Sequence, residues 1–217
     1  MNSDKEIFEK VYEKPETAVW TEKEPPIELV ELIKSGKIKP CKVIDVGCGE
    51  GFYSIYLSSE KFDVLGIDIS KNAIKYAKEN AKKAGVNIKF KAMDFNDLSE
   101  IKEKFDFVLE WGILHCIPFE KRKKYVETMN KLLKNNGKYL STCFNVQDTK
   151  FGGPLQKIRI VPESARALMG EEMYFSSLDE IKELFEPYFS IIESKVFEKI
   201  GGGKVNIWNY FFMEKRK

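Results

Sequence analysis

The sequence predicts an α/β fold in which a doubly wound, mostly parallel sheet lies between two layers of helices. The first observation is an alternation of short apolar runs, rich in β-branched residues, with polar segments whose apolar residues recur at helical spacing. The second is that the apolar runs are almost uninterrupted, which is typical of parallel strands covered on both faces. The third is a glycine-rich loop directly after the first of these runs.

The first two thirds of the chain give the parallel part of the sheet. A lead-in helix is expected within 25–40, where apolar residues form a stripe and Gly36 provides the stop. Ser70 begins a later helix and Gly85 ends it. The expected strands are 41–46, 62–69, 86–93, 105–111 and 138–144, and the expected helices between them are 51–60, 72–85 and 120–137.

The last third of the chain has a different pattern. Residues 151–175 contain prolines and glycines without a firm period, so we expect an excursion over the edge of the sheet at about 145–175. Ser177 and Glu180 form a capping box that opens a helix, and Pro187 ends it. Runs at 189–198 and 204–214 flank a glycine turn and predict an antiparallel hairpin.

Composition limits the classes of function. The 217 residues are 43% hydrophobic and 32% charged, with 36 basic and 34 acidic residues interleaved on helix faces. Such balance does not favour a nucleic-acid partner. No apolar run approaches the length of a membrane span, so we expect a cytoplasmic protein without a membrane partner. His115 is the sole histidine and the cysteines form no CxxC pair, so no metal site is predicted.

The glycine loop reads VIDVGCGEGF, with Gly47, Gly49 and Gly51 at alternate positions. A dinucleotide fingerprint has the spacing GxGxxG, whose last glycine would fall at Phe52. The phosphate-binding P-loop is disfavoured too, because no GK[ST] ending follows. The loop therefore matches neither of the two common phosphate-binding patterns.

Acidic residues surround this loop. Asp45 precedes it, Glu50 lies within it, and Asp68 ends the next expected strand. Carboxylates oppose an anionic pyrophosphate and favour a cation such as S-adenosylmethionine (SAM), which carries an ammonium and a sulfonium. A carboxylate at position 68 can accept hydrogen bonds from ribose hydroxyls in either an NAD or a SAM site. The alternative for Asp68 is an N-cap of the following helix, although Ser70 is better placed for that role.

Four motifs in this order resemble the class I SAM-dependent methyltransferases. They are VIDVGCGEG, the acidic Asp68, AMDFND and FDFVLEWGILHCI. The resemblance implies a seven-stranded sheet in a three-layer α/β/α arrangement, with SAM as the cofactor. It assigns cofactor contacts to Trp20, Asp45, Gly47, Cys48, Gly49, Tyr53, Asp68, Ile69, Asp94, Phe95, Glu110 and Trp111.

Several of these assignments have alternatives. Trp20 and Tyr53 either stack on the cofactor or belong to the core, and Glu110 either contacts a ligand or pairs with a lysine. His115 is a candidate catalytic base because its ordinary pKa is near neutrality. It could instead pack under the cofactor or cap a turn. Cys48 is expected to fill a small apolar space in the loop.

A narrower resemblance is to the thiopurine and thiol S-methyltransferase branch. It rests on AVWTEKEPPIELVEL, with Trp20 and Pro26, and on the later GGP segment. It implies that residues 1–40 form a helical lead-in that covers the cofactor, ahead of a methyltransferase domain at 41–217. The chain departs from that branch at Val46, where a proline is frequent, and at its fourth-strand motif.

The expected function is methyl transfer from SAM to a small-molecule acceptor, with a thiol preferred. An RNA or protein substrate, or SAM binding without turnover, is the alternative. Arg159 and Arg166 lie in the excursion and could hold an anionic substrate, or be solvated. The acceptor atom (S, N, O or C) and the choice between monomer and homodimer are open at this point.

Overall fold

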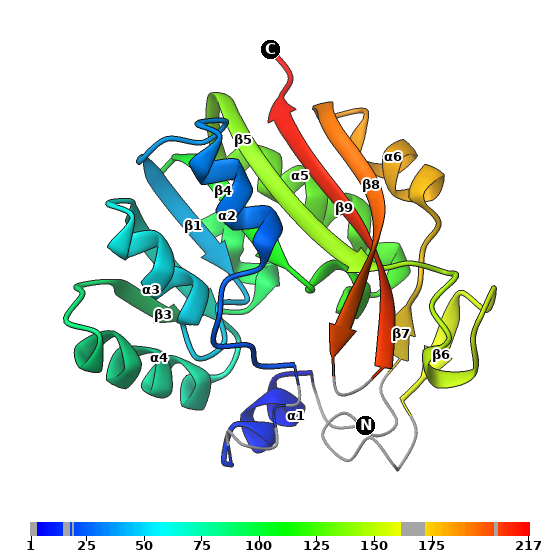
Figure 1. The fold of residues 1–217 in the computed structure, drawn as a ribbon, viewed down its shortest axis with the longest axis horizontal. Coiled ribbons are helices and arrows are strands. Elements are labelled where there is room, and N and C mark those ends of the chain that lie inside the picture. Colours follow the sequence, from blue (N-terminus) through cyan, green and yellow to red (C-terminus); the bar gives the residue numbers. More distant parts are fainter. Residues whose placement is uncertain (1–3, 15–17, 19, 162–171, 202–203) are drawn as a thin grey trace.

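In the computed structural model of the protein, the described residues form a seven-stranded sheet (Figure 1). The structure describes residues 4–14, 18, 20–161, 172–201 and 204–217. The strands are β1 (Lys42–Val46), β2 (Asp63–Asp68), β3 (Lys89–Ala92), β4 (Phe105–Trp111), β5 (Leu133–Phe144), β8 (Phe189–Gly201) and β9 (Lys204–Lys215). Their order across the sheet is β3-β2-β1-β4-β5-β9-β8.

The strand directions confirm the predicted fold class. The pairs that join β3, β2, β1, β4 and β5 are all parallel, whereas β9 runs antiparallel to both β5 and β8. A doubly wound parallel sheet therefore carries the expected C-terminal hairpin at one edge. The helices in the described ranges are α1 (Asp4–Val11), α2 (Ile27–Lys34), α3 (Phe52–Ser59), α4 (Lys71–Lys83), α5 (Arg122–Leu132) and α6 (Leu178–Phe185).

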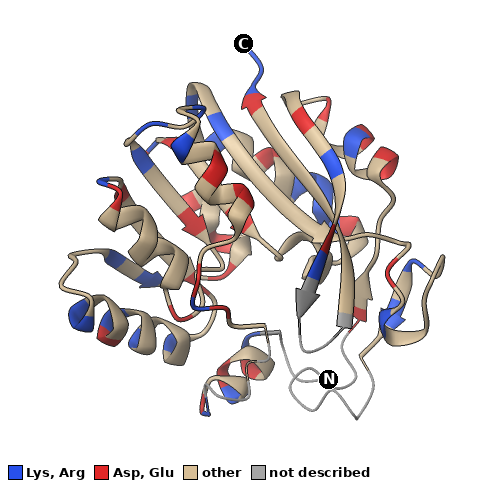
Figure 2. Cartoon of the chain, in the orientation of Figure 1, with Lys and Arg blue, Asp and Glu red and all other residues tan. Residues whose placement is uncertain are grey.

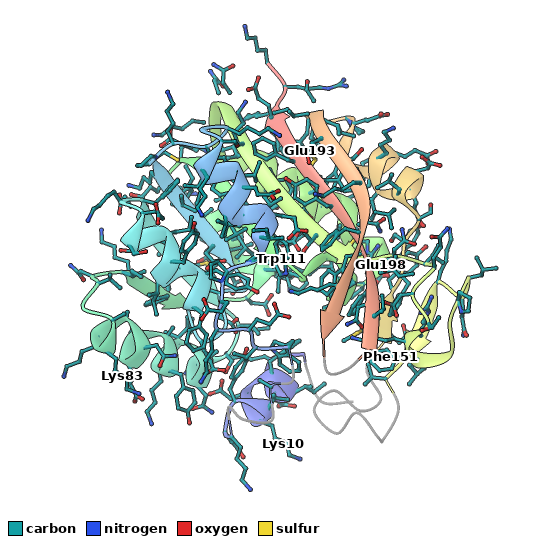
Figure 3. The ribbon with its side chains drawn as sticks, in the orientation of Figure 1. Lys10, Lys83, Trp111, Phe151, Glu193 and Glu198 are labelled. Atoms are coloured by element: carbon teal, nitrogen blue, oxygen red, sulfur yellow. The ribbon has the colours of Figure 1, made fainter. Side chains whose placement is uncertain are left out.

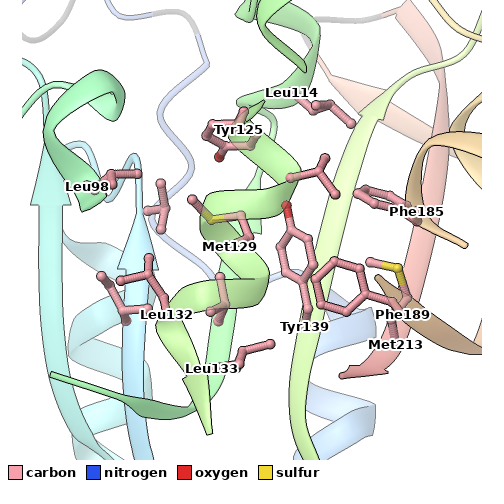
Figure 4. Close-up of a cluster of buried hydrophobic side chains, with 14 of the residues drawn as sticks. Leu98, Leu114, Tyr125, Met129, Leu132, Leu133, Tyr139, Phe185, Phe189 and Met213 are labelled. Carbon is pink, nitrogen blue, oxygen red and sulfur yellow. The ribbon is translucent and has the colours of Figure 1, made fainter. Parts of the chain in front are cut away.

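Helices cover both faces of the sheet because each central strand is apolar on both sides. In β1, Ile44 and Val46 face one way and Val43 faces the other, as the two-residue period of a strand requires. Ile44 and Val46 pack with apolar side chains of α5 and α6, a core shown in Figure 4. Val43 packs with side chains of α2 and α3. Each layer thus buries its own apolar cluster.

Three elements differ from the sequence expectations. Helix α1 was not expected in the polar start of the chain. Helix α5 ends at Leu132, earlier than predicted, because Leu133 already pairs with Phe105 of β4 and Asn136 takes a left-handed φ of 60°. The excursion contains two short antiparallel strands, β6 (Ile158–Ile160) and β7 (Glu172–Tyr174), while residues 162–171 lie outside the described ranges.

The strand order reverses between β1 and β4. From β1 the chain proceeds outward through β2 and β3, and it then returns to the other side of β1 as β4. In open α/β sheets, the loops that diverge at such a point leave a crevice at the carboxyl ends of the strands. The glycine loop follows β1 directly and so borders this crevice. In the part of the chain that the structure describes, no helix is long and apolar enough to cross a membrane.

Candidate active site

A cavity of about 660 Å³ lies at the carboxyl ends of the parallel strands. Its floor is the loops after β1, β2 and β4, and its other walls come from the N-terminal segment around α1 and from the β8–β9 hairpin. Predicted residues that line it are Trp20, Asp45, Gly47, Cys48, Gly49, Tyr53, Asp68, Ile69, Phe95, Trp111 and His115. Trp111 lies near the middle of the molecule, as Figure 3 shows.

At Gly47 and Gly49 the glycine loop presents its backbone to this cavity. Gly47 and Gly49 have left-handed φ values of 75° and 52°. A Cβ at Gly47 would lie 2.2 Å from Cδ1 of Ile113, and one at Gly49 would lie 2.9 Å from the Tyr12 hydroxyl. The N–H groups of Gly47 and Cys48 both donate to the Ile67 carbonyl, at 2.8 and 2.9 Å. Side chains are therefore excluded from this wall by both conformation and space.

Asp68 is buried at the end of β2 and reaches back to the glycine loop. Its Oδ2 accepts a hydrogen bond of 2.9 Å from the Gly49 N–H, and its Oδ1 accepts one of 2.9 Å from the Ser70 N–H. Burial raises the pKa of Asp68 to about 6, although these two hydrogen bonds oppose the rise. Because a carboxylate has about four acceptor positions, both oxygens can still accept from a ligand. Ser70, rather than Asp68, caps α4 through the Ala73 N–H.

Asp45 stands on the neighbouring strand, where β1 enters the loop. It is buried, and its Oδ2 accepts a hydrogen bond of 2.6 Å from the Ser54 hydroxyl. Burial, together with the negative charge of Asp68, raises the pKa of Asp45 to about 7. A cation bound between the two carboxylates would lower both pKa values, because it stabilises their ionised forms.

An apolar region adjoins the end of β3. The side chains of Met93, Phe95, Leu98 and Ile69 line the cavity there, which suits a flat apolar ring. Asp94, predicted to contact the cofactor, is not part of the lining. Its Oδ1 instead accepts hydrogen bonds of 2.8 Å from the backbone and side-chain nitrogens of Asn96, in the first turn of the short 3₁₀ helix Phe95–Glu100. The aspartate is an N-cap in this structure.

Glu110 is likewise placed away from the cavity lining, contrary to the expectation that it contacts the cofactor. It is fully buried. Its Oε1 accepts from the N–H groups of Ile113 and Leu114, and its Oε2 accepts from the hydroxyls of Tyr139 and Ser141, all within 3.0 Å. The carboxylate therefore holds the turn after β4 against β5, which fixes the position of the next residues.

His115 lies in that turn and is buried at the cavity wall. Its ring is 4.2 Å from that of Phe144 and 5.6 Å from that of Trp208. Burial, together with the positive charges of Arg122 and Lys150, lowers the pKa of His115 to about 3. A neutral imidazole is thus present at neutral pH, and its Nδ1 has no hydrogen-bond partner among the residues that the structure describes.

The aromatic residues predicted for the site contact one another and the N-terminal segment. The Trp20 Nε1–H donates to the Tyr12 hydroxyl at 3.0 Å. The Tyr53 hydroxyl donates to Glu22 at 3.3 Å, and the Tyr53 ring meets that of Trp111 edge-on at 6.3 Å. Burial raises the pKa of the Cys48 thiol well above its usual range, which keeps this cysteine unreactive.

A match to a family of known proteins agrees with this geometry. A family model described as a methyltransferase domain matches residues 37–191, which is most of the chain. The chain belongs to the methyltransferase-domain family. The predicted resemblance to class I SAM-dependent methyltransferases is thereby confirmed.

Parts of this methyltransferase domain are similar to curated proteins. A 2-heptyl-1-hydroxyquinolin-4(1H)-one methyltransferase of Mycobacteroides abscessus is 27% identical over 147 residues, which are 64% of each chain. The probable SAM-dependent methyltransferase TehB of Haemophilus influenzae is 33% identical over 102 residues, which are 46% of this chain and 35% of TehB. The chain thus spans between about a third and two thirds of these relatives.

Solved structures show the same fold. The 1,6-didemethyltoxoflavin-N1-methyltransferase of Burkholderia thailandensis superposes with a TM-score of 0.76 at 19% identity, over 98% of this chain and 87% of that one. The crystal structure of Haemophilus influenzae TehB superposes with a TM-score of 0.70 at 21% identity, over 96% of this chain and 67% of that one.

The methyltransferase domain also has cavity residues that the sequence did not single out. Phe8 and Tyr12 come from the unexpected α1 segment, Phe144 ends β5, and Lys199 and Trp208 come from the hairpin. Four of these five residues are aromatic, and aromatic residues are common in cores as well as in binding sites, so the sequence does not separate the two roles.

The arginine considered for substrate binding has a structural role in this fold. Arg159 is buried, and its guanidinium donates to the carbonyls of Gln156, Asp148, Lys150 and Val146, at 2.6–2.8 Å. It also lies over the Phe175 ring, 3.7 Å from its centroid. Four of its five N–H donors are thus used by the loop that it organises. Arg166 lies outside the described residues.

Two further observations concern other possible binding sites. A second hollow, of about 460 Å³, lies between α2 and β8 and is walled mainly by lysines and glutamates; it contains none of the predicted site residues. Across the described ranges, no cluster of three or more histidines, cysteines or acidic residues is arranged to hold a metal ion.

Proposed function

We propose that this methyltransferase domain transfers a methyl group from SAM to a small-molecule acceptor. The observation that carries the proposal is one continuous cavity, with a backbone-lined glycine wall and two buried carboxylates at one end and an aromatic wall at the other. The residues present fit SAM, because Asp45 and Asp68 supply negative charge beside a wall that a Cβ would obstruct.

Different residues of the cavity would contact different parts of SAM. Asp68 would accept hydrogen bonds from the ribose hydroxyls, and Asp45 would offset the positive charge of the amino-acid part. The apolar residues after β3 would hold the adenine. Tyr12 and Trp20, in the N-terminal segment, would exclude water from the bound SAM. SAM supplies a methyl group on a sulfonium, and its transfer breaks the C–S bond as the acceptor's lone pair forms the new bond.

The protein's main contribution to the reaction would be positioning. Holding two reacting groups in line and in contact can supply roughly 7–11 kcal/mol of the barrier reduction. His115 is a weak base here, because its pKa is lowered to about 3, so it would orient an acceptor through a hydrogen bond rather than remove its proton. This favours an acceptor that enters already deprotonated, and a thiol is the preferred case because thiols ionise most readily.

The test is a methyl-transfer assay with radiolabelled SAM against thiols, phenols, ring nitrogens, amines, a lysine peptide and a transfer RNA. Label in a small molecule supports the proposal. Label in only the peptide or the RNA would replace it with a macromolecular substrate. SAM binding without transfer to any acceptor would point to a binding protein.

A further inference from the structure

The lysines of the cavity lie apart from its glycine loop. Asp45, Glu50 and Asp68 line the end beside that loop, whereas Lys150 and Lys199 line the far side; Glu22 and Glu172 also line the cavity (Figure 2 colours the charged residues along the chain). The Lys199 Nζ lies 5.3 Å from the centroid of the Trp111 ring and 5.7 Å from that of the Trp208 ring. The proposed SAM end is thus acidic, and the end left for the acceptor has two lysines in its wall.

Aromatic rings form the wall at the end where Lys150 and Lys199 lie. Phe144 lies 4.5 Å from Trp208 between ring centroids, and it stacks on Phe175 at 4.9 Å with an angle of 6° between the planes. A Cβ at Gly112 would lie 3.3 Å from the Trp208 ring, so the glycine leaves room for this indole. Such walls favour planar aromatic ligands, which gain from stacked and edge-on contacts.

Polar atoms without partners lie in the same wall. The Nδ1 of His115, the Oδ1 of Asn206 and the indole nitrogens of Trp111 and Trp208 are buried and have no hydrogen-bond partner within the described ranges. Both His115 and Asn206 are more than nine-tenths buried. An unpaired buried polar group is costly, so a ligand with polar atoms on its ring would be favoured here.

We propose that this end of the cavity binds a planar aromatic or heteroaromatic acceptor in its anionic form, lying against the wall that Trp111, Phe144 and Trp208 form, with Lys199 as its main counter-charge. The inference rests on the proposed methyl transfer and adds the class of the acceptor. Lys199 also pairs with Glu22 at 2.5 Å. An ammonium has three donors, so one ion pair leaves others for the acceptor.

An anionic acceptor accounts for the weak base in this wall. The acceptor loses its proton to solvent before the methyl transfer, because Lys199 stabilises the negative charge of the deprotonated acceptor. The lone pair of the acceptor atom then forms the bond to the methyl carbon, and the electrons of the broken C–S bond remain on sulfur. The anion and the sulfonium both become neutral, so no protein group needs to take up a proton during the step.

The experiment uses 4-nitrophenol, a flat aromatic probe whose ionised form has its own absorption band, added to protein saturated with S-adenosylhomocysteine (SAH). Difference spectra across pH give the pKa of the bound probe. We expect bound 4-nitrophenol to ionise about one pH unit below the free probe, which is about a tenfold preference for the anion. Non-planar cyclohexanol should bind far more weakly.

The variants separate charge from shape. Lys199→Met should abolish the shift in probe ionisation but leave binding of the uncharged 4-nitroanisole unchanged, and Lys199→Arg should keep the shift. Trp208→Ala should weaken binding of both aromatic probes, with Trp208→Phe in between. The matched control is Lys195→Met, since Lys195 is on the same strand, pairs with Glu193 and lies at the surface hollow instead.

Two results would overturn the inference while SAH still binds. One is a bound probe that ionises no more readily than the free probe, and the other is cyclohexanol binding as tightly as 4-nitrophenol. A protein that binds neither SAM nor SAH would instead refute the proposed function. Retained SAH affinity in each variant shows that the variant is folded.

Discussion

Asp45 and Asp68 are ionisable groups that the fold keeps buried at the end of neighbouring strands. Burial raises their pKa values to about 7 and 6, so near neutrality a fraction of each is protonated before any ligand binds. Glu9, Tyr12, Cys48 and Tyr53 are titratable groups that interact electrostatically with one or both of them. A cationic ligand requires ionised carboxylates, so its binding releases protons.

We therefore expect SAM affinity to rise with pH. Above about pH 8 both carboxylates are ionised and affinity is constant, and below about pH 6 a proton must leave before the cation binds. Titration calorimetry should show an affinity about a hundredfold lower at pH 5.5 than at pH 8, because both carboxylates must be ionised. In buffers of different ionisation enthalpy, proton release should be measurable near pH 6.5. A flat affinity over this range would contradict the assignment of these two groups.

Replacing Asp68 tests the proposed ribose contact. Asp68→Ala removes a charged acceptor. A hydrogen bond to a charged group contributes about 1.5–3 kcal/mol, so this variant should bind SAM about tenfold more weakly or worse. Asp68→Asn keeps the size and one acceptor oxygen and should lie between. Asp106→Ala, at the opposite end of the sheet, serves as the control, since Asp106 pairs with Lys134 far from the cavity. Unchanged affinity in Asp68→Ala would remove the ribose assignment.

Replacing His115 separates orientation from proton transfer. The low pKa of His115 predicts that His115→Ala keeps the pH profile of kcat/KM and loses less than about 10²-fold in rate, which is the lower limit for an essential base. His115→Asn should recover part of the loss, because it restores a hydrogen-bonding group. A loss beyond about 10⁴-fold, with a changed pH profile, would show that this histidine is an essential base.

At the scale of elements, Glu9 is a polar anchor of α1, beside the apolar packing of Ile7, Phe8 and Val11 on the domain. The Glu9 carboxylate accepts hydrogen bonds from the Ser70 hydroxyl at 2.7 Å and the Asn72 N–H at 3.2 Å, at the start of α4. This position is favourable for a carboxylate because the N-terminus of a helix carries partial positive charge. The contact places Tyr12 over the glycine loop.

Glu9→Ala should therefore loosen the cover without unfolding the domain. We expect faster cleavage of the first 20 residues by a protease and an SAH affinity lowered several-fold, with little change in the denaturation midpoint. Lys5→Ala is the matched control, because Lys5 lies on the same helix and is exposed. Equal protease resistance in the two variants would show that Glu9 does not hold the segment.

The elements themselves differ in how far the sequence predicts them. The helix begun by Ser70 was predicted because its cap and its apolar period are local signals. Asp94 is assigned to the ligand from the resemblance of AMDFND to a methyltransferase motif, and Glu110 because it lies at the carboxyl end of a parallel strand. Their actual partners are Asn96, close by, and Tyr139 and Ser141 on another strand, which only the register of β4 on β5 brings into reach.

At the scale of the whole molecule, Glu110 links the turn below the cavity to the central sheet. Glu110→Ala would leave four buried donors unpaired, and each costs about 1–3 kcal/mol, so the variant should lose several kcal/mol of unfolding free energy in urea. Glu110→Gln should lose less. A matched control is Glu127→Ala, which removes an exposed ion pair with Lys131. Equal stability of Glu110→Ala and the wild type would contradict the role as a structural link.

The position of the last strand has a consequence for the newly made chain. β9 lies between β5 and β8, so β8 leaves the ribosome before the strand that joins it to the sheet exists. The incomplete sheet then ends at β5, with its unpaired backbone groups open to other chains. Trp208 is on β9, so the aromatic wall also forms only after β9 has been synthesised. A chain released early would have the glycine loop but no completed acceptor site.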